Sequence, residues 1–326
     1  MARYWGFWTR GKLDLLRRYL DAFTTASKSQ SEILYLDLFG GQPTNRERLT
    51  EHDLDGSARI ALSTGDAPFS RLRCFELEPF ATRLGAALQR DFPGRDVQVI
   101  PGNCNETIGA TLSSLASVNW APTFAFVDPN GADVEWSTLE ALAKFKKAGR
   151  TKTEIWLLLA VGMFTRTLPI DGDVRLQDAS KLTRLYGTSS WQHIYEARVQ
   201  GRLSPGEARE EYVNLMRWRL ETVLGYRWTH PLEIFNERGS SIYHMVFATD
   251  HEAGNRIMTD LYRTAAGEFP AMREAARRRR ARLEEEASGI HNLFGPDLDD
   301  LRAPIARSER LYVHVPPDPP YEATSS

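Results

Sequence analysis

The sequence has little cysteine and no long hydrophobic run. Its 326 residues include only two cysteines, Cys74 and Cys104, which excludes a disulfide framework and any zinc site built mainly on cysteine. The seven histidines show neither HxxxH nor HExxH spacing, so we expect no metal site. No stretch is apolar and long enough for a transmembrane helix, and the first residues lack a signal-peptide hydrophobic region. We therefore expect a cytoplasmic protein that does not bind a membrane.

An excess of one charge is also missing. Lys and Arg number 41, Asp and Glu number 43, and the formal net charge is -2. This balance does not call for nucleic acid as a partner, although it is compatible with a local basic groove. Hydrophobic residues make up 42% of the chain, which is enough for a sizeable core, and the length allows one large domain or two small ones.

Short apolar runs alternate with helical patterns through the first half of the chain. Such runs predict strands that are buried on both faces of a parallel sheet, with helices on either side. Two later strand candidates, joined by a plausible turn, predict a terminal antiparallel hairpin. We expect an α/β, Rossmann-like class I methyltransferase fold, with strands near 33–38, 72–77, 97–100, 123–128, 154–161, 226–234 and 242–249.

The helical spacing of apolar residues over 12–26 predicts an amphipathic helix before the first strand. A helical insertion is expected at 162–225, where Ser204, Pro205 and Glu207 form a capping box that opens a helix. Its apolar stripe comprises Tyr212, Met216, Leu220 and Val223. We expect the insertion to overhang the site and to set specificity. The predicted organisation is a methyltransferase core at 1–161 and 226–265, the insertion at 162–225, a charged C-terminal helix at 266–295 and a proline-rich tail at 296–326.

Polar residues stand at the ends of four successive predicted strands. In an open parallel sheet, ligands bind outside the carboxyl ends of the strands, near the point where the strand order reverses. The residues at these four ends are Asp37, Glu76, Asn103 and Asp128. Their common position is the main functional signal in the sequence.

The first of these ends reads YLDLFGGQP and contains Asp37, Phe39, Gly40 and Gly41. The glycines allow a tight turn and a close approach of the backbone to a ligand. An acidic residue, an aromatic or small residue and then glycines form the first class I methyltransferase motif, which cradles the methionine part of S-adenosylmethionine. The alternative is a plain strand-to-loop turn.

The next two ends are candidates for the rest of that cofactor. Glu76 can accept both hydroxyls of a ribose, as in dinucleotide-binding folds, or it can cap the following helix. Glu78 competes for the ribose role because strand alternation places it on the same side. Asn103 would contact the adenine through its amide, and the alternative is that Asn103 and Asn105 are ordinary turn residues.

The fourth end, Asp128-Pro129-Asn130-Gly131, partly matches the (D/N)PP(Y/F/W) motif of methyltransferases that act on amino nitrogens of bases. There, the carboxylate and a proline carbonyl accept hydrogen bonds from the amino group, and the aromatic ring stacks on the base. Asp128, Pro129 and Asn130 are therefore the candidate catalytic residues, and Trp136 is the nearest aromatic that could substitute for the missing ring. The alternatives for Asp128 are a helix cap or a salt bridge with an arginine.

Two other segments also match functional patterns. Residues 318–321 read DPPY, a literal match to the base-methylation motif, but no helix follows and the segment lies beyond the α/β pattern. We interpret it as part of an extended proline-rich tail, which could serve as a peptide ligand. The arginine run at 277–280 indicates a solvated, self-paired helix face, and the alternative is phosphate contact.

The ordered segments KLDLLRRYLDAF, YLDLFGGQP, CFELEP, GNCNETI, FAFVDPNG and YHMVFATDHEAGNRIM resemble the three-Cys-motif partner (TcmP) family over residues 5–265. The resemblance implies an S-adenosylmethionine site that comprises Asp37, Gly40, Gly41, Glu76 and Asn103, with Asp128 facing the substrate. It also implies a partner, a radical-SAM-like protein with three cysteines. The chain departs from the family pattern at Gln42, Pro43, Asn103 and Asn130.

Two functions are consistent with these observations. The first is a methyltransferase acting on nucleic acid or on a nucleobase-like amino group, with Asp128 accepting a hydrogen bond from the nucleophile. The second is a non-catalytic module that binds DNA, RNA or the three-cysteine partner in repair or phage defence, which the departures from the family pattern and the arginine-rich helix favour.

Overall fold

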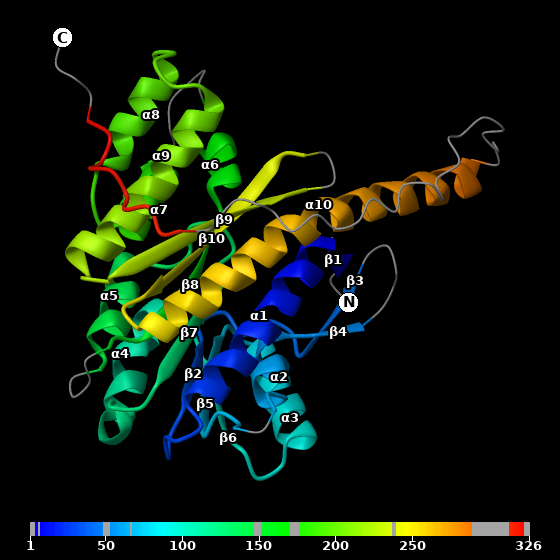
Figure 1. Ribbon diagram of the computed structural model, residues 1–326, viewed down its shortest axis with the longest axis vertical. Helices are drawn as coiled ribbons and strands as arrows, with labels where there is room; N and C mark the ends of the chain where they lie inside the picture. The colour runs from blue at the N-terminus through cyan, green and yellow to red at the C-terminus, as the bar shows by residue number, and fades with distance from the viewer. Residues whose placement is uncertain are drawn as a thin grey trace.

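A seven-stranded sheet forms the centre of the computed structural model, which describes residues 4–5, 7–47, 53–65, 67–146, 151–169, 176–236, 239–288 and 313–322 (Figure 1). The strand order is β6-β5-β2-β7-β8-β10-β9, in which the first five strands are parallel and β10 is antiparallel to both β8 and β9. The bounds are β2 Leu34–Asp37, β5 Arg71–Glu76, β6 Asp96–Pro101, β7 Thr123–Val127, β8 Glu154–Leu159, β9 Trp228–Phe235 and β10 Ser241–Thr249. This arrangement confirms the predicted Rossmann-like methyltransferase fold with its terminal antiparallel hairpin.

The strand order reverses at β2, which pairs with β5 on one side and β7 on the other. The crevice outside the carboxyl ends of strands at such a switch point is where open α/β sheets bind ligands. The ends of β2, β5 and β7 carry Asp37, Glu76 and Asp128. The topology therefore brings these three predicted residues to one edge of the sheet.

One face of the sheet is covered by α1 Phe7–Ala26, α2 Ser57–Leu62, α3 Phe80–Asp91 and α10 Glu252–Ser288. Aromatic rings dominate this layer: Tyr19 of α1 lies 5.3 Å from Phe124 and 5.0 Å from Phe247, measured between ring centroids. Such ring pairs contribute about 0.5–1.5 kcal/mol each beyond the area that they bury. They fix α1 against the sheet, so the residues at the amino end of α1 have a defined position.

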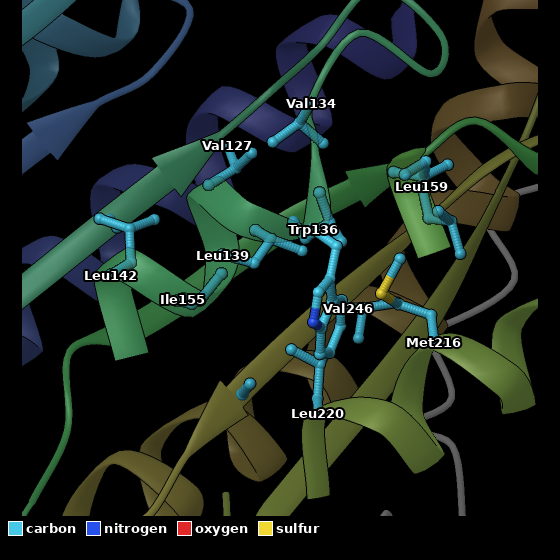
Figure 2. Packing of buried hydrophobic residues seen from close by; sticks show 14 of the residues in the cluster. Val127, Val134, Trp136, Leu139, Leu142, Ile155, Leu159, Met216, Leu220 and Val246 are labelled. Carbon is cyan, nitrogen blue, oxygen red and sulfur yellow. The ribbon is translucent and has the colours of Figure 1, made fainter. Parts of the chain in front are cut away.

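The opposite face is covered by α4 Cys104–Ser114, η1 Ala116–Val118, α5 Trp136–Lys144, α6 Val161–Thr167, α7 Leu176–Tyr186, α8 Trp191–Val199 and α9 Pro205–Trp218, with the π-helical turn η2 Arg219–Val223. Figure 2 shows Met216 and Leu220 from this helical segment beside Val246 of β10 and Trp136 of α5. Fully burying each such side chain stabilises the fold by about 1.5–3 kcal/mol. The helices between β8 and β9 therefore share one core with the sheet.

The start of α9 has the predicted capping box. Ser204 Oγ accepts from the Glu207 backbone N–H at 3.2 Å, and Glu207 Oε2 accepts from the Ser204 N–H at 2.7 Å. The predicted burial of Val223 is wrong, because this side chain is 49% exposed and Leu224 is buried instead. The π-helical turn adds a residue to the last turn of the helix and so moves Val223 off the apolar stripe.

A small second sheet accounts for the long spacing between Asp37 and Glu76. It consists of β1 Tyr4–Trp5, β3 Thr44–Glu47 and β4 Asp53–Asp55 in the order β1-β3-β4. The chain passes through β3 and β4 after the glycine loop, and only then forms α2. The helix that would directly follow the loop in a minimal βαβ unit is thus delayed by this pair of strands.

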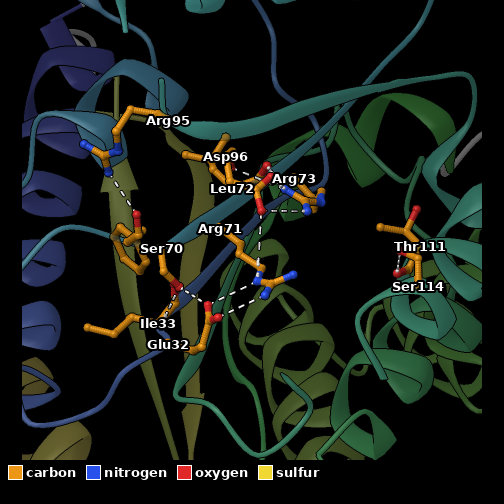
Figure 3. Close-up of polar contacts among 11 residues, drawn as sticks. Glu32, Ile33, Ser70, Arg71, Leu72, Arg73, Arg95, Asp96, Thr111 and Ser114 are labelled. Atoms are coloured by element: carbon orange, nitrogen blue, oxygen red, sulfur yellow. Dashed lines mark hydrogen bonds and ion pairs between the residues drawn. The ribbon is translucent and has the colours of Figure 1, made fainter. Parts of the chain in front are cut away.

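The amino ends of the strands carry a separate polar network (Figure 3). Arg71 Nη2 donates to Glu32 Oε1 at 2.9 Å, and Arg73 Nη1 donates to Asp96 Oδ1 at 2.8 Å. These charges pair with one another across β2, β5 and β6. We therefore assign this network to stability rather than to ligand binding.

The C-terminal region contains one long helix and one extended segment. Helix α10 runs unbroken from Glu252 to Ser288, so the boundary expected at residue 265 falls inside it, and it lies beside α1 (Figure 1). Residues 313–322, drawn in red, lie extended near α9. The Asn214 side-chain amide bonds both the N–H and the C=O of Asp318, at 2.9 and 3.0 Å. The DPPY segment is therefore bound to the chain's own helix.

Candidate functional site

The glycine loop after β2 is fixed by backbone hydrogen bonds to both neighbouring strands. The Leu38 N–H donates to Phe126 O at 3.0 Å, and the Gly40 N–H donates to Phe75 O at 2.8 Å. A Cβ at Gly40 would lie 2.8 Å from the Leu84 side chain, so glycine is required there for packing against α3. The loop at Gly40 is therefore packed tightly against β5 and α3.

Asp37 is completely buried beneath this loop. Its carboxylate accepts from the Phe39 N–H at 3.4 Å, from Tyr35 Oη at 3.3 Å and from the Ser57 hydroxyl. Burial raises the pKa of Asp37 to about 7, with a further rise from the negative charge of Asp128, while these hydrogen bonds oppose the rise. The position indicates that Asp37 organises the loop and the start of α2 from inside the fold.

Glu76 lies at the mouth of the loop. Its Oε2 accepts from the Gly41 N–H and its Oε1 from the Leu77 N–H, both at 2.7 Å. Gly41 has a φ of +62°, and a Cβ there would have no neighbour closer than 3.8 Å. Glu78 instead accepts from the Thr82 hydroxyl at 2.9 Å on the first turn of α3. Glu76, and not Glu78, is the carboxylate joined to the glycine loop.

Gln42 and Pro43 direct the chain out of the loop. The Gly56 N–H donates to Pro43 O at 2.9 Å, and a Cβ at Gly56 would lie only 2.2 Å from Gln42 O. The close approach of these backbones ties the loop to the start of α2. These two departures from the family pattern therefore belong to the link that leads into β3.

Apolar side chains are exposed beside Glu76. Leu77 is 57% exposed and Phe80 is 44% exposed, on the loop and first turn that follow β5. Large apolar side chains next to a fixed carboxylate form a surface that suits a flat ring joined to a sugar: the ring can contact the apolar side chains, and the sugar hydroxyls can donate to the carboxylate. The sequence did not predict a role for Leu77 or Phe80, although the segment CFELEP contains Leu77 next to Glu76.

Asn103 and Asn105 have structural roles at the start of α4. Asn103 is the N-cap residue, and its Oδ1 accepts from the Asn105 N–H at 3.0 Å. The Asn105 amide donates to Asp133 O at 2.8 Å and accepts from the Glu135 N–H at 3.0 Å. Asn103 is thus a helix cap, a role that the sequence did not predict, and Asn105 holds the loop that follows β7.

Asp128 is paired with a lysine from near the amino terminus of the chain. Lys12 Nζ of α1 contacts Asp128 Oδ2, although the two residues are 116 positions apart in the sequence. The Lys12 side chain is only 10% exposed and that of Asp128 is 28% exposed, so the pair is largely shielded from water. Breaking a buried pair by removing one partner costs about 3–5 kcal/mol, and partial exposure lowers this figure. Asp128 therefore forms the salt bridge that was one alternative, with a lysine in place of an arginine.

The rest of the β7 loop folds against α6. Pro129 is buried and Asn130 is exposed. Gly131 has a φ of +83°, its N–H donates to Pro129 O at 3.1 Å, and a Cβ there would lie 3.3 Å from Met163. The proline carbonyl thus already accepts one hydrogen bond and retains its second lone pair.

Trp136 does not substitute for the aromatic residue of the base-methylation motif. Its ring is buried in the core, and the Arg219 guanidinium lies 4.3 Å from the ring centroid. Lys12 was missed as a member of the site, although its spacing of four from Leu16 places a cation on the buried stripe of the predicted helix. That spacing was the one available sequence signal.

Within the described ranges, no group of three or more His, Cys, Asp or Glu side chains could hold a metal ion. Over the same residues, no helix is long and apolar enough to cross a membrane. Cys74 and Cys104 are both buried and unbridged.

Comparisons with known proteins give only distant structural similarities. No family model and no curated protein matches the chain. Solved structures that match include yhhF from Escherichia coli, a candidate methyltransferase, at 12% identity and TM-score 0.31, covering 68% of this chain and 77% of that one. Protein LPL1258 from Legionella pneumophila has 10% identity, TM-score 0.38 and coverages of 72% and 84%. The methyltransferase domain of bacterial CtHen1 has 13% identity, TM-score 0.32 and coverages of 72% and 99%.

These TM-scores are low, so the assignment of the fold rests on the strand order itself. A sheet ordered β6-β5-β2-β7-β8-β10-β9, with only β10 reversed, is that of the class I methyltransferases. The resemblance to the TcmP family stays a prediction.

Proposed function

We propose that the chain is an S-adenosylmethionine-dependent methyltransferase that acts on nucleic acid or on a nucleobase-like amino group. The observation that carries this proposal is the meeting of the glycine loop, Glu76 and Asp128 at the switch point of the sheet. Along this edge, in the order of the strands, lie the oriented carboxylate of Glu76 after β5, the open turn at Gly41 after β2 and the carboxylate of Asp128 after β7. A nucleoside cofactor with a reactive methyl group needs these elements in this order.

The residues present fit the cofactor. Glu76 is oriented by two backbone N–H groups, which leaves its remaining lone pairs for the ribose hydroxyls. The exposed Leu77 side chain supplies an apolar surface for the adenine, and the open space at Gly41 admits the methionine part. When bound, S-adenosylmethionine supplies an electrophilic methyl group. Asp37, being buried, supports the loop and does not contact this ligand.

Asp128 would bind the methyl acceptor. Lys12 contacts Oδ2, and no hydrogen bond to Oδ1 is found among the described residues, so Oδ1 can accept one from an amino group. The lysine also keeps the carboxylate in one orientation. An amino group held in this way directs its lone pair away from the carboxylate, which is the requirement for transfer to nitrogen.

Transfer of tritium from methyl-labelled S-adenosylmethionine to single-stranded DNA and RNA tests this function. Asp128→Ala is expected to reduce the rate about 100-fold, because the loss of an oriented acceptor typically costs several kcal/mol in the transition state. Asp133→Ala is the matched control, since this carboxylate is in the same loop and pairs with Lys181 on the surface. Equal rates for the two variants would remove Asp128 from the acceptor site.

The Lys12–Asp128 pair also favours a second function. A carboxylate already engaged by a lysine suits a binding module that uses the same edge without transferring a methyl group. In that case the chain would bind nucleic acid or the three-cysteine radical-SAM-like partner. Co-purification with that partner, or DNA binding that weakens steeply with added salt, without any methyl transfer, would support this alternative.

A further inference from the structure

A cavity lies at the amino-terminal ends of the central strands, at the edge of the sheet opposite Glu76 and Asp128. Thr123 and Glu154, the first residues of β7 and β8, line it. Its volume is about 250 Å³, and both α1 and α10, which run side by side, contribute to its lining (Figure 1). An apolar cavity of about 150 Å³ admits benzene, so this one has room for a one-ring molecule with small polar groups.

Glu154 is the acidic group of this cavity. Its side chain is buried, and its two oxygens accept from the Tyr19 and Thr249 hydroxyls. A Cβ at Gly254 would lie 2.1 Å from Oε1, so the first turn of α10 approaches the acid closely only because it has glycine here. The two hydroxyls and the helix fix the carboxyl group, and each oxygen retains a lone pair that can accept from a ligand.

Lys146 is the basic group of the cavity, and its charge is not paired. Among the described residues, it forms no ion pair and donates only to the Thr151 hydroxyl, at 3.3 Å. Lys152, which also lines the cavity, pairs with Asp250 at 3.2 Å. Lys146 is partly buried, and this burial lowers its pKa. A cation that has lost part of its hydration gains most from a negatively charged partner, which a ligand can supply here.

Glu154 and Lys146 line the same cavity without meeting, since no ion pair joins these two described residues. Burial raises the pKa of Glu154 to about 7, so the acid is about half protonated at pH 7 in the free protein. The other titratable groups around it are Tyr19, His251 and Asp250 with its partner Lys152. A molecule that carries both an ammonium and a carboxylate group would pair with both side chains, whereas a singly charged molecule leaves one of them unpaired.

The remaining wall of the cavity is largely apolar. Phe23 of α1 and Ile257 of α10 contribute from the helices, and Trp120 and Pro122 contribute from the segment before β7. Trp120 is 38% exposed, so its ring lies at the mouth of the cavity. Apolar and aromatic walls with a few fixed polar groups are typical of small-molecule sites.

We propose that this cavity binds a free α-amino acid with an apolar side chain. The ammonium group donates to Glu154, the carboxylate pairs with Lys146, and the apolar side chain packs against Phe23 and Trp120. This ligand class follows from the two opposite charges at one cavity and from its apolar wall. The site is separate from the edge that carries Glu76 and Asp128, so the inference is independent of the proposed function.

Calorimetric titration of the full chain with L-phenylalanine and L-leucine, without S-adenosylmethionine, tests this proposal. Phenylacetate and phenethylamine are the matched ligands, because each lacks one of the two charged groups. We expect L-phenylalanine to bind about 10- to 100-fold more tightly than either, the effect of one hydrogen bond to a charged group. Because binding ionises Glu154, the wild-type chain should release about half a proton per ligand at pH 7, measured by titration in two buffers with different heats of ionisation.

Variants of the two charged residues assign each contact. Lys146→Met should weaken the binding of L-phenylalanine about 10- to 100-fold. Lys144→Met is the matched control and should leave the affinity unchanged, because Lys144 is exposed and pairs with Glu140 at 2.6 Å. Glu154→Gln, which keeps the shape of the acid, should also weaken binding and should abolish the proton release.

Four results would overturn the inference: no binding of either amino acid at millimolar concentration, equal affinities for L-phenylalanine and one of its singly charged analogues, equal affinities of Lys146→Met and Lys144→Met, or the same proton release in Glu154→Gln as in the wild type. Equal affinities of the two lysine variants would show that the amino acid binds elsewhere, such as at the glycine loop. None of these results bears on the proposed function, because S-adenosylmethionine binding and methyl transfer are measured separately.

Discussion

Glu154 offers a direct test of how burial controls the stability of this fold. It is the first residue of β8, is buried, and accepts hydrogen bonds from Tyr19 Oη of α1 and, at 2.7 Å, from Thr249 Oγ1 of β10. Burial raises the pKa of Glu154 from 4.5 to about 7, and the two hydroxyl donors oppose this rise. The folded protein therefore holds a proton on Glu154 at a pH where the unfolded chain does not.

The sign of the effect follows from proton binding. Because the folded-state pKa is the higher one, Glu154 favours folding fully below about pH 4.5, and this contribution is lost as the pH rises to about 7. A shift of this size corresponds to about 3 kcal/mol, of which about 2–3 kcal/mol falls between pH 5 and pH 8. Asp37, whose pKa is also raised to about 7, adds a slope of the same sign.

Glu154→Gln replaces the protonated acid with a neutral group of the same shape. We expect its free energy of unfolding, from urea titration, to be close to that of the wild type at pH 5 and higher by about 2–3 kcal/mol at pH 8. Comparing the two proteins at each pH cancels the contribution of Asp37. A difference that is the same at both pH values would refute the reasoning.

Two further predictions concern residues with defined hydrogen bonds. Asn105→Ala removes the hydrogen bonds to Asp133 O and from the Glu135 N–H. It should lower the free energy of unfolding, measured by denaturation, by about 1–3 kcal/mol. It should also slow methyl transfer in the tritium assay, because the loop after β7 is held less firmly. Asn214→Ala removes both bonds to Asp318, so hydrogen exchange in 313–322 should speed up about 5- to 30-fold while global stability changes little.

The sequence predicted the parts of the fold that depend on local patterns. Continuous apolar runs revealed the strands of the central sheet, and the box at Ser204 and Glu207 located the start of α9. The strands β3 and β4 were not predicted, because TNRE and DLD are short and polar and show no apolar period. The π-helical turn was missed because it depends on packing and not on residue type.

The sequence predicted the candidate site only where its residues stand at the ends of strands. The positions of Asp37, Glu76 and Asp128 at one edge follow from the parallel topology. The choice between Glu76 and Glu78 could not be made from alternation, since both fall on the same side. In the structure, Glu76 accepts from the Gly41 N–H and Glu78 accepts from Thr82. The partnership of Lys12 with Asp128 spans 116 positions and depends on how α1 packs on the sheet, which no local pattern contains.

Calorimetric titration of the wild-type chain with S-adenosylmethionine is the first test of the proposed cofactor site. Glu76→Gln and Glu78→Gln form a matched pair, since the two carboxylates are two positions apart and only the first meets the glycine loop. We expect micromolar binding, weakened about 10- to 100-fold in Glu76→Gln through the loss of charge-assisted hydrogen bonds, and unchanged in Glu78→Gln. No binding at millimolar ligand, or equal affinities for the two variants, would contradict this expectation.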